Sequence, residues 1–250
     1  MSDQTKNYAS HRSSSLGSVR LAAIVLPMII SVVVLLGCGE NPPSVITALD
    51  GTFSDQKVAA QCLPELDRAA DIAAERGGSF TFFAYDGDPL SRRGISIDFG
   101  DQAIPNRLKG TEKEGEYRVE QAGPILNEMH KLASDRPTVG GTSLLGVLTR
   151  IARIAKGLGS VPTYVVNCGD GLWTDLRPGM SDREVQGLAR EIPVGMEGMT
   201  IDFVGLSVSA PGSGHWVERL RPLVKQILED KQAHLGVYDV ELPADWPQGS

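Results

Sequence analysis

Cysteine is scarce in this chain, with only three residues among 250. They stand at positions 38, 62 and 168, with no CxxC pair and no cluster with histidine, which excludes a structural zinc site. Basic residues are also outnumbered, because 24 Lys and Arg stand against 31 Asp and Glu. Nucleic-acid binding needs clustered Lys and Arg, so we expect no nucleic-acid partner.

Three catalytic motifs are missing or incomplete. No Gly-x-Ser-x-Gly elbow occurs, which argues against an α/β-hydrolase serine. The glycine spacing of residues 141–146 is that of a phosphate loop, but Val147 and Leu148 stand where Lys and Ser or Thr are needed. Residues 50–52 resemble part of the Asp-x-Asp-x-Thr motif of haloacid dehalogenase-type phosphatases, yet Ala48 replaces the nucleophilic Asp. A metal-dependent phosphatase of that type is therefore the alternative and not the main hypothesis.

The N-terminal part is typical of an exported protein. Residues 1–20 hold three basic side chains against one acid, and an apolar run follows from Leu21 to Gly37. Residues 35–38, which end in Cys38, resemble a bacterial lipobox. The resemblance implies that residues 1–37 are a lipoprotein signal peptide and that Cys38 carries the acyl chains, palmitate among them. It places the protein at the bacterial cell envelope, held to a membrane by its lipid.

An uncleaved membrane anchor is the other interpretation of this segment, because the apolar run is near the lower limit for spanning a bilayer. Both interpretations place the remaining chain outside the cytoplasmic membrane. We expect a short tether over residues 38–43, one domain over residues 44–241 and a tail over residues 242–250.

The domain shows strands alternating with helices. The apolar patterns predict strands over 44–49, 79–85, 95–99, 161–167, 199–208 and 235–240, and helices over 57–76, 114–132, 143–156, 182–190 and 215–232. Pro64 should kink the first helix or mark its start, and Gly123-Pro124 should interrupt the second. The strand over 95–99 follows its predecessor so closely that an antiparallel edge strand is expected.

This alternation predicts an α/β fold, with an open, mainly parallel sheet of about six strands and helices on both faces, as in Rossmann-like proteins. In such sheets ligands gather beyond the carboxyl ends of the strands, at the point where the strand order reverses. Loops that follow two different strands can therefore meet at one site.

Three short stretches carry oxygen side chains at such positions. Asp50, Thr52 and Ser54 alternate directly after the first strand, Thr142 follows two glycines before a helix, and Asp170 follows the fourth strand. Carboxylates and hydroxyls are hard ligands that suit Mg²⁺, Mn²⁺ or Ca²⁺. The sequence therefore predicts a divalent-cation site at the carboxyl edge of the sheet.

These five residues, with the strands and helices around them, resemble the von Willebrand factor type A domain over nearly all of residues 44–240. In that family an Asp-x-Ser-x-Ser stretch, a distant Thr and a distant Asp form the metal-ion-dependent adhesion site. The resemblance implies that Thr52, Ser54 and Thr142 supply hydroxyls, while Asp50 and Asp170 act largely through bound water. It also implies Mg²⁺, or Mn²⁺ or Ca²⁺, with an open position for a carboxylate of a partner protein.

The chain departs from the family at two points, because Thr52 replaces the commoner serine and Gly169 precedes Asp170 where a threonine is usual. We therefore expect an adhesion-type binding module and not an enzyme, with a scaffold that uses the fold without metal as a further alternative.

The sequence leaves two interpretations open for each of three other residues. Trp173 lies just beyond Asp170, either packed in the core or exposed as a partner contact. Cys62 and Cys168 are either a disulfide pair or two buried thiols.

Overall fold

The computed structural model describes residues 42–52, 56–88, 90, 93–135, 140–158, 164–207 and 212–247. The described residues from Pro42 onward form one compact unit. Their elements follow the order β1 (Ser44–Asp50), α2 (Gln56–Glu75), β2 (Ser79–Tyr85), β3 (Gly94–Asp98), α3 (Lys113–Ala133), α4 (Leu144–Leu158), β4 (Tyr164–Cys168), α5 (Asp182–Glu191), β5 (Thr200–Val204), α6 (Gly214–Asp230) and β6 (His234–Tyr238).

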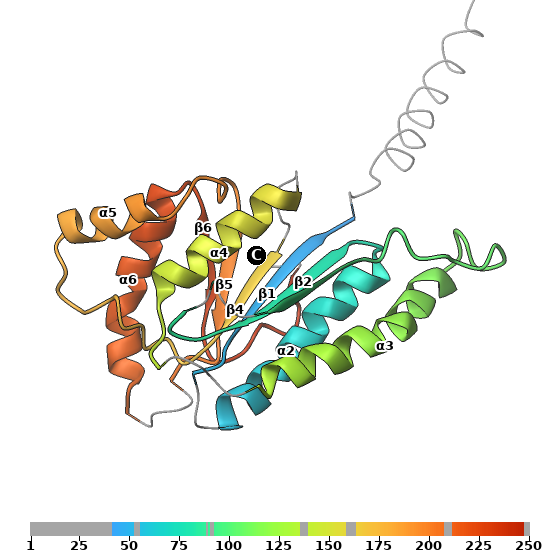
Figure 1. Cartoon of the computed structure of the whole chain (residues 1–250), viewed down its shortest axis with the longest axis horizontal. Helices are drawn as coiled ribbons and strands as arrows, with labels where there is room; N and C mark the ends of the chain where they lie inside the picture. The colour runs from blue at the N-terminus through green and yellow to red at the C-terminus, as the bar shows by residue number, and fades with distance from the viewer. Residues whose placement is uncertain are drawn as a thin grey trace, which may run out of the picture. The chain divides into compact units, whose positions relative to one another are not determined.

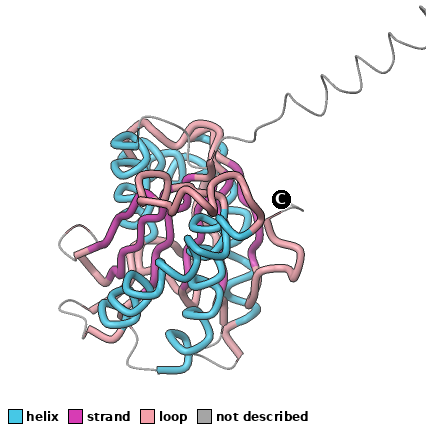
Figure 2. Tube along the Cα trace, turned by 90° about the vertical axis from the view of Figure 1, so that its right-hand side faces the viewer, coloured by secondary structure: helices cyan, strands magenta, loops and turns pink. Residues whose placement is uncertain are grey.

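The six strands form one sheet in the order β3-β2-β1-β4-β5-β6. All neighbouring strands are parallel except β3, which pairs antiparallel with β2 at the edge. The fold is therefore the open, mainly parallel α/β sheet that the sequence predicts, with its antiparallel edge strand in the expected place. In a view turned by 90°, the loops gather at the two ends of the strands (Figure 2).

Helices cover both faces of the sheet, with α2 and α3 on one face and α4, α5 and α6 on the other (Figure 1). The alternation along β1 produces the two hydrophobic layers. Ile46 and Ala48 pack in the cluster that includes α4, α5 and α6, while Val45 and Leu49 pack in the cluster that includes α2 and α3. Because both faces of β1 are covered, all seven of its residues are buried.

Three expectations about local structure need correction. Helix α3 runs through Pro124 without the interruption predicted near Gly123-Pro124, because Ala122, Met129 and Leu132 anchor it to the core on both sides of the proline. Pro64 lies inside α2, so it does not mark the start of that helix. Strand β5 ends at Val204, earlier than expected.

The C-terminal segment, expected as a tail, packs on the folded domain. Leu242 and Trp246 are buried in the same cluster as α2 and α3. The Arg68 guanidinium on α2 donates to the main-chain oxygens of Ala244 and Trp246, both at 2.7 Å. Residues 242–247 are therefore part of the domain.

Candidate functional site

The predicted site lies where the strand order reverses. From β1 the chain proceeds to β2 on one side of the sheet, and from β4 it proceeds to β5 on the other, while β1 and β4 are neighbours. Asp50 is the last residue of β1, and Asp170 stands two residues beyond β4. The two loops therefore leave the sheet side by side and diverge, which is the usual place for a ligand in this class of fold.

Asp50, Thr52 and Thr142 form one hydrogen-bonded cluster. The Thr52 hydroxyl and amide donate to Asp50 Oδ1 at 2.5 and 2.9 Å, and the Thr142 hydroxyl donates to Asp50 Oδ2 at 2.9 Å. The two hydroxyl oxygens are 2.8 Å apart. Residues separated by 90 positions in the chain thus meet at one carboxylate.

Asp170 lies beside this cluster in its own turn. Its Oδ1 accepts from the Leu172 amide at 2.9 Å, and its main-chain oxygen accepts from the Ser207 amide at 3.0 Å. Gly171 has a φ of +77°, and a β-carbon there would lie 2.8 Å from a Leu206 methyl group, so glycine is needed for the turn. Asp170 is close enough to Asp50 for its charge to act on that carboxyl.

The pKa of Asp50 reflects this environment. Burial raises it from 3.8 to about 6, the hydrogen bonds from Thr52 and Thr142 act against that increase, and the charge of Asp170 adds to it. A buried carboxylate next to a second carboxylate is an unfavourable arrangement for the ionised form. A cation between the two would favour ionisation.

Thr142 is held by residues of the β4–α5 loop that the sequence analysis did not identify. The Thr174 amide and hydroxyl both donate to the Thr142 main-chain oxygen, at 2.7 and 2.8 Å. The Asp175 carboxylate accepts from the amides of Leu144 and Leu145 and from the Ser143 hydroxyl, at 2.8 to 3.0 Å. Asp175 thus caps the start of α4 although it lies some thirty residues later in the chain. No local sequence pattern could therefore predict this cap.

A disulfide lies beside the Asp170 turn. Cys62 on α2 is bonded to Cys168 at the end of β4, with their Cα atoms 5.8 Å apart. Gly205 passes close to it, because a β-carbon there would lie 2.9 Å from the Cys62 sulfur. The covalent link ties α2 to the strand that carries Asp170.

The oxygen cluster fits a small divalent cation. Asp50 accepts a hydrogen bond from each threonine hydroxyl, so lone pairs of both hydroxyl oxygens remain for a cation. Their separation of 2.8 Å matches the edge of a Mg²⁺ octahedron, which is about 2.8–3.0 Å for metal–oxygen bonds of 2.0–2.1 Å. Ca²⁺, with bonds of about 2.3–2.6 Å, requires a wider spacing.

Within the described part of the chain, no three His, Cys, Asp or Glu side chains gather where they could hold a metal. The candidate site consists of two carboxylates and two hydroxyls, so it is not a group of that kind. It would hold a cation through Thr52 and Thr142 directly, with Asp50 and Asp170 supplying charge.

Two predicted residues, Ser54 and Cys38, lie outside the described residues. Trp173 is described, and its possible role as an exposed contact is corrected, because it is buried and packs edge-to-face on Phe203 with ring centroids 5.6 Å apart. The exposed aromatic near the site is Trp216, in the first turn of α6. Its neighbour Val217 lies against Gly171, so the first turn of α6 packs beside the Asp170 turn.

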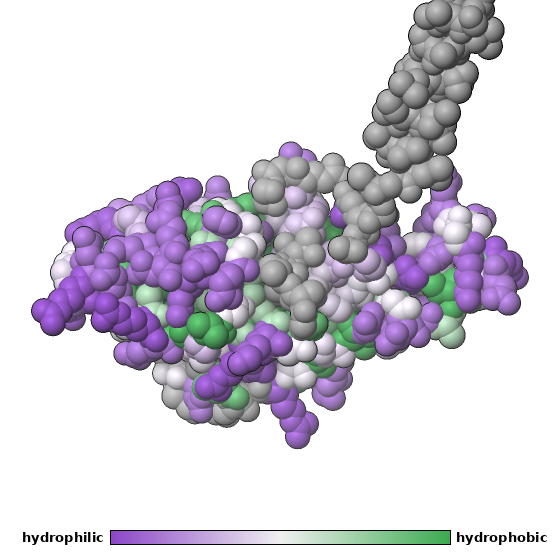
Figure 3. Space-filling view, turned by 90° about the horizontal axis from the view of Figure 1, so that it is seen from above, coloured by the Kyte–Doolittle hydropathy of each residue, from purple (hydrophilic) through white to green (hydrophobic). Residues whose placement is uncertain are grey.

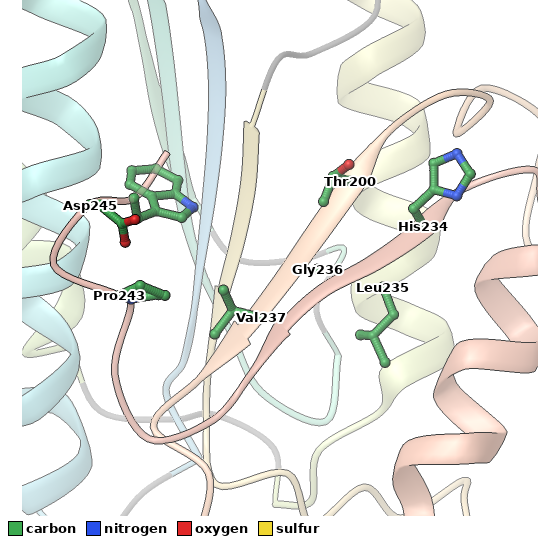
Figure 4. Close-up of a pocket in the computed structure, with 8 residues that line it drawn as sticks. Thr200, His234, Leu235, Gly236, Val237, Pro243 and Asp245 are labelled. Atoms are coloured by element: carbon green, nitrogen blue, oxygen red, sulfur yellow. The ribbon is translucent and has the colours of Figure 1, made fainter. Parts of the chain in front are cut away.

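A cavity of about 460 Å³ lies elsewhere, beside β5 and β6. Figure 4 shows Val237 between Pro243 and Asp245 on one side and Thr200 and His234 on the other. Thr200 and His234 begin their strands, so the cavity lies toward the end of the sheet opposite Asp50. It is separate from the oxygen cluster.

None of the known protein-family models matches this chain, and no curated protein matches it. Among the described residues, none of the helices combines the length and apolar character that crossing a membrane requires. In the space-filling view of Figure 3, hydrophobic residues appear as small separate areas among hydrophilic ones.

Proposed function

We propose that this protein binds a divalent cation, Mg²⁺ by preference, at Asp50, Thr52, Thr142 and Asp170. The observation that carries the proposal is the pair of threonine oxygens 2.8 Å apart, both of which hydrogen-bond to one buried carboxylate. Ser54 belongs to the proposed ligand set from the sequence pattern. The arrangement supports a type A-like adhesion site, as the resemblance implies.

The cation in such a site has a role in recognition. Thr52 and Thr142 would hold the cation through their hydroxyls, Asp50 and Asp170 would supply negative charge, and the bound cation would attract a carboxylate of a partner protein. Ala48, at the position of a phosphatase nucleophile, is buried in the sheet and offers no such group. We therefore favour protein binding over turnover.

The polarity of β1 supports a membrane-tethered arrangement. Pro42 and Pro43 precede Ser44 at one end of the strand and Asp50 ends it, about 20 Å away for seven extended residues. An acyl chain on Cys38 would then attach the domain at the edge opposite the cation site, which would face away from the membrane. Cys38→Ser should release the protein from the membrane fraction, while reagents that label the region around Thr142 should reach it in bound protein. Protection of that region by lipid contradicts the arrangement.

Calorimetric titration tests cation binding on the chain from residue 39 onward, whose described part forms one compact unit. We expect saturable binding of one Mg²⁺ or Mn²⁺, weakened at least about tenfold by Thr142→Val. Thr47→Val is the matched control, because Thr47 lies earlier in β1 and donates to the Thr81 main-chain oxygen. Absence of saturable binding overturns the proposal and favours a scaffold without metal.

Recognition is tested with immobilised peptides that differ only in Asp against Asn. We expect Mg²⁺-dependent, EDTA-reversible binding of the Asp peptides, weakened by Trp216→Ala. Equal binding of both peptide sets contradicts a carboxylate at the open position. Hydrolysis of a generic phosphate ester in Mg²⁺, lost in Asp50→Asn, would favour the phosphatase alternative instead.

A further inference from the structure

The loop between β3 and α3, residues 99–112, begins beside the point where the chain enters the domain. The Phe99 amide donates to the Gly78 main-chain oxygen at 2.8 Å, and the adjoining Ser79 amide donates to the Pro43 main-chain oxygen at 2.9 Å. A β-carbon on Gly78 would lie 1.9 Å from that Pro43 oxygen, so the two segments pass in direct contact. The loop therefore leaves the sheet at the edge where β1 begins, opposite the candidate cation site (Figure 1).

The two ends of this loop are fixed to the domain. Phe99 is fully buried in the cluster that includes α2 and α3. At the other end, the first turn of α3 packs closely on α2, because a β-carbon on Gly115 would lie 3.0 Å from the Glu75 side chain. Between these two anchors the loop extends past the start of α3 (Figure 1).

The tip of the loop carries two apolar side chains that lie outside the core. Ile104 and Leu108 are half-buried, yet neither belongs to the two core clusters of the described residues. Turns hold the tip in shape, since the Leu108 amide donates to the Pro105 main-chain oxygen at 2.8 Å and the Thr111 amide donates to that of Leu108 at 3.0 Å. A β-carbon on Gly110 would have no atom outside the adjoining residues within 4 Å, so the tip projects into open space.

The charge of the tip is opposite in sign to that of the whole chain. Residues 102–111 contain Arg107 and Lys109 and no acidic residue, whereas acidic residues outnumber basic ones by 31 to 24 in the chain. Both basic side chains are exposed, and neither forms an ion pair within the part of the chain that the structure describes. The acids next to this stretch, Asp101 and Glu112, adjoin its base. A basic tip with apolar side chains complements an anionic lipid surface.

We propose that this tip contacts the surface of the membrane that holds the N-terminal segment, with Arg107 and Lys109 at anionic headgroups and Ile104 and Leu108 at the acyl boundary. The inference rests on the membrane-tethered arrangement proposed above. Together with the tether, the contact would fix the orientation of the domain and keep the cation site directed away from the lipid.

The length of the tether supports this contact. Cys38 precedes Pro42 by four residues, so even an extended chain holds Pro42 within about 14 Å of a lipid on Cys38. The loop begins beside Pro43 and is therefore held near the same surface. A short tether gives the loop a high effective concentration at the membrane, so a contact that is weak by itself is sufficient.

Tryptophan fluorescence of the full chain in vesicles tests the contact. Leu108→Trp places a reporter at the tip, and phospholipids with brominated acyl chains quench a tryptophan that reaches the acyl boundary. In vesicles of phosphatidylethanolamine and phosphatidylglycerol, we expect the emission added relative to the wild type to be mostly lost when the lipids are brominated. Leu90→Trp is the matched control, because Leu90 is 47% exposed and lies between β2 and β3 at the opposite edge of the sheet. Its added emission should be unchanged.

The role of the basic residues is tested by Arg107→Gln with Lys109→Gln in the Leu108→Trp protein. Each basic residue near an anionic surface contributes about fivefold, so the contact should weaken about 25-fold and the emission should return. Arg183→Gln with Arg219→Gln is the matched control, since it removes the same charge from exposed positions on α5 and α6. Quenching that is equal in these two proteins would overturn the assignment of Arg107 and Lys109 to the headgroups.

The outcomes separate this inference from the proposed function. If the wild-type chain does not sediment with the vesicles, the tether and the loop contact are both overturned. If it sediments and Leu108→Trp is quenched no more than Leu90→Trp, only the loop contact is overturned. The tip lies at the edge opposite the cation site, so Leu108→Trp should leave the Mg²⁺ affinity unchanged.

Discussion

Two buried carboxylates on this sheet, Asp50 and Asp202, differ in the partners that surround them. Asp50 is 2% exposed and Asp202 is 1% exposed, and burial raises the pKa of both. Asp202 accepts from the Val237 amide at 2.7 Å and from the Trp246 indole at 2.8 Å. Asp50 accepts from two hydroxyls and an amide and lies near a second carboxylate.

The two carboxylates differ in whether the groups that donate hydrogen bonds to them can also bind a cation. An amide and an indole N–H have no lone pair for a cation, so Asp202 is a closed structural contact that joins β6 and the C-terminal segment to β5. A hydroxyl that donates to Asp50 keeps its oxygen available to a metal. A buried carboxylate therefore indicates a ligand site only when its partners can also be ligands.

Asp50→Asn should have the largest effect on cation binding. Loss of the charge should weaken Mg²⁺ affinity by about 100-fold, the upper end for groups that support a metal through water. In EDTA at pH 7 the variant should be more stable by about 1–3 kcal/mol, because an ionised carboxyl no longer has to be buried. Calorimetry and chemical denaturation measure the two quantities. Unchanged Mg²⁺ binding by Asp50→Asn would show that Asp50, like Asp202, has only a structural role.

Asp202→Ala should show the opposite pattern. Two buried donors lose their acceptor, which should lower the free energy of unfolding by about 2–4 kcal/mol. Mg²⁺ affinity should be unchanged, because Asp202 lies on the face of the sheet that packs against the C-terminal segment. Denaturation curves and Mg²⁺ titrations at a temperature where the variant is folded measure both. Weakened binding by the folded variant would show that the two regions are coupled.

The pH dependence should follow the pKa of Asp50, which is raised from 3.8 to about 6. Without cation, the protonated carboxyl is favoured in the folded state. Its contribution of roughly 3 kcal/mol is therefore complete below pH 3.8 and is lost as the pH rises through 6. Cation binding needs the ionised form, so Mg²⁺ affinity should be about tenfold lower at pH 5 than at pH 7. Equal affinities in titrations at pH 5, 6 and 7 would contradict this assignment, and Asp50→Asn should remove the dependence.

Asp175→Ala should have a smaller effect that reports on positioning. It removes the cap of α4 and should lower the free energy of unfolding by about 1–2 kcal/mol. Because the capped turn carries Thr142, Mg²⁺ affinity should fall severalfold as well. Ser181→Ala is the matched control, since it removes the capping box of α5 and should cost about 1 kcal/mol without affecting the cation. If the two variants changed the Mg²⁺ affinity equally, the Asp175 cap would have no specific role in positioning Thr142.

The sequence allowed the fold class and the meeting of Asp50, Thr52, Thr142 and Asp170 to be predicted. Strand ends are marked locally, and the rule that ligands gather at the carboxyl edge then places the following loops together. The errors came from contacts across the chain. Pro124 breaks a helix in isolation, but its neighbours pack on the core, and residues 242–247 are held by Arg68 and Asp202.

By itself the sequence determined the alternation of elements and the oxygen chemistry at the strand ends, because these depend on composition and short-range periodicity. Tertiary structure alone decided that the two threonine oxygens lie 2.8 Å apart and that Trp173 is buried. Distances of this kind depend on how β1, β2, β4 and α4 pack together, and no local pattern encodes a contact between residues ninety positions apart.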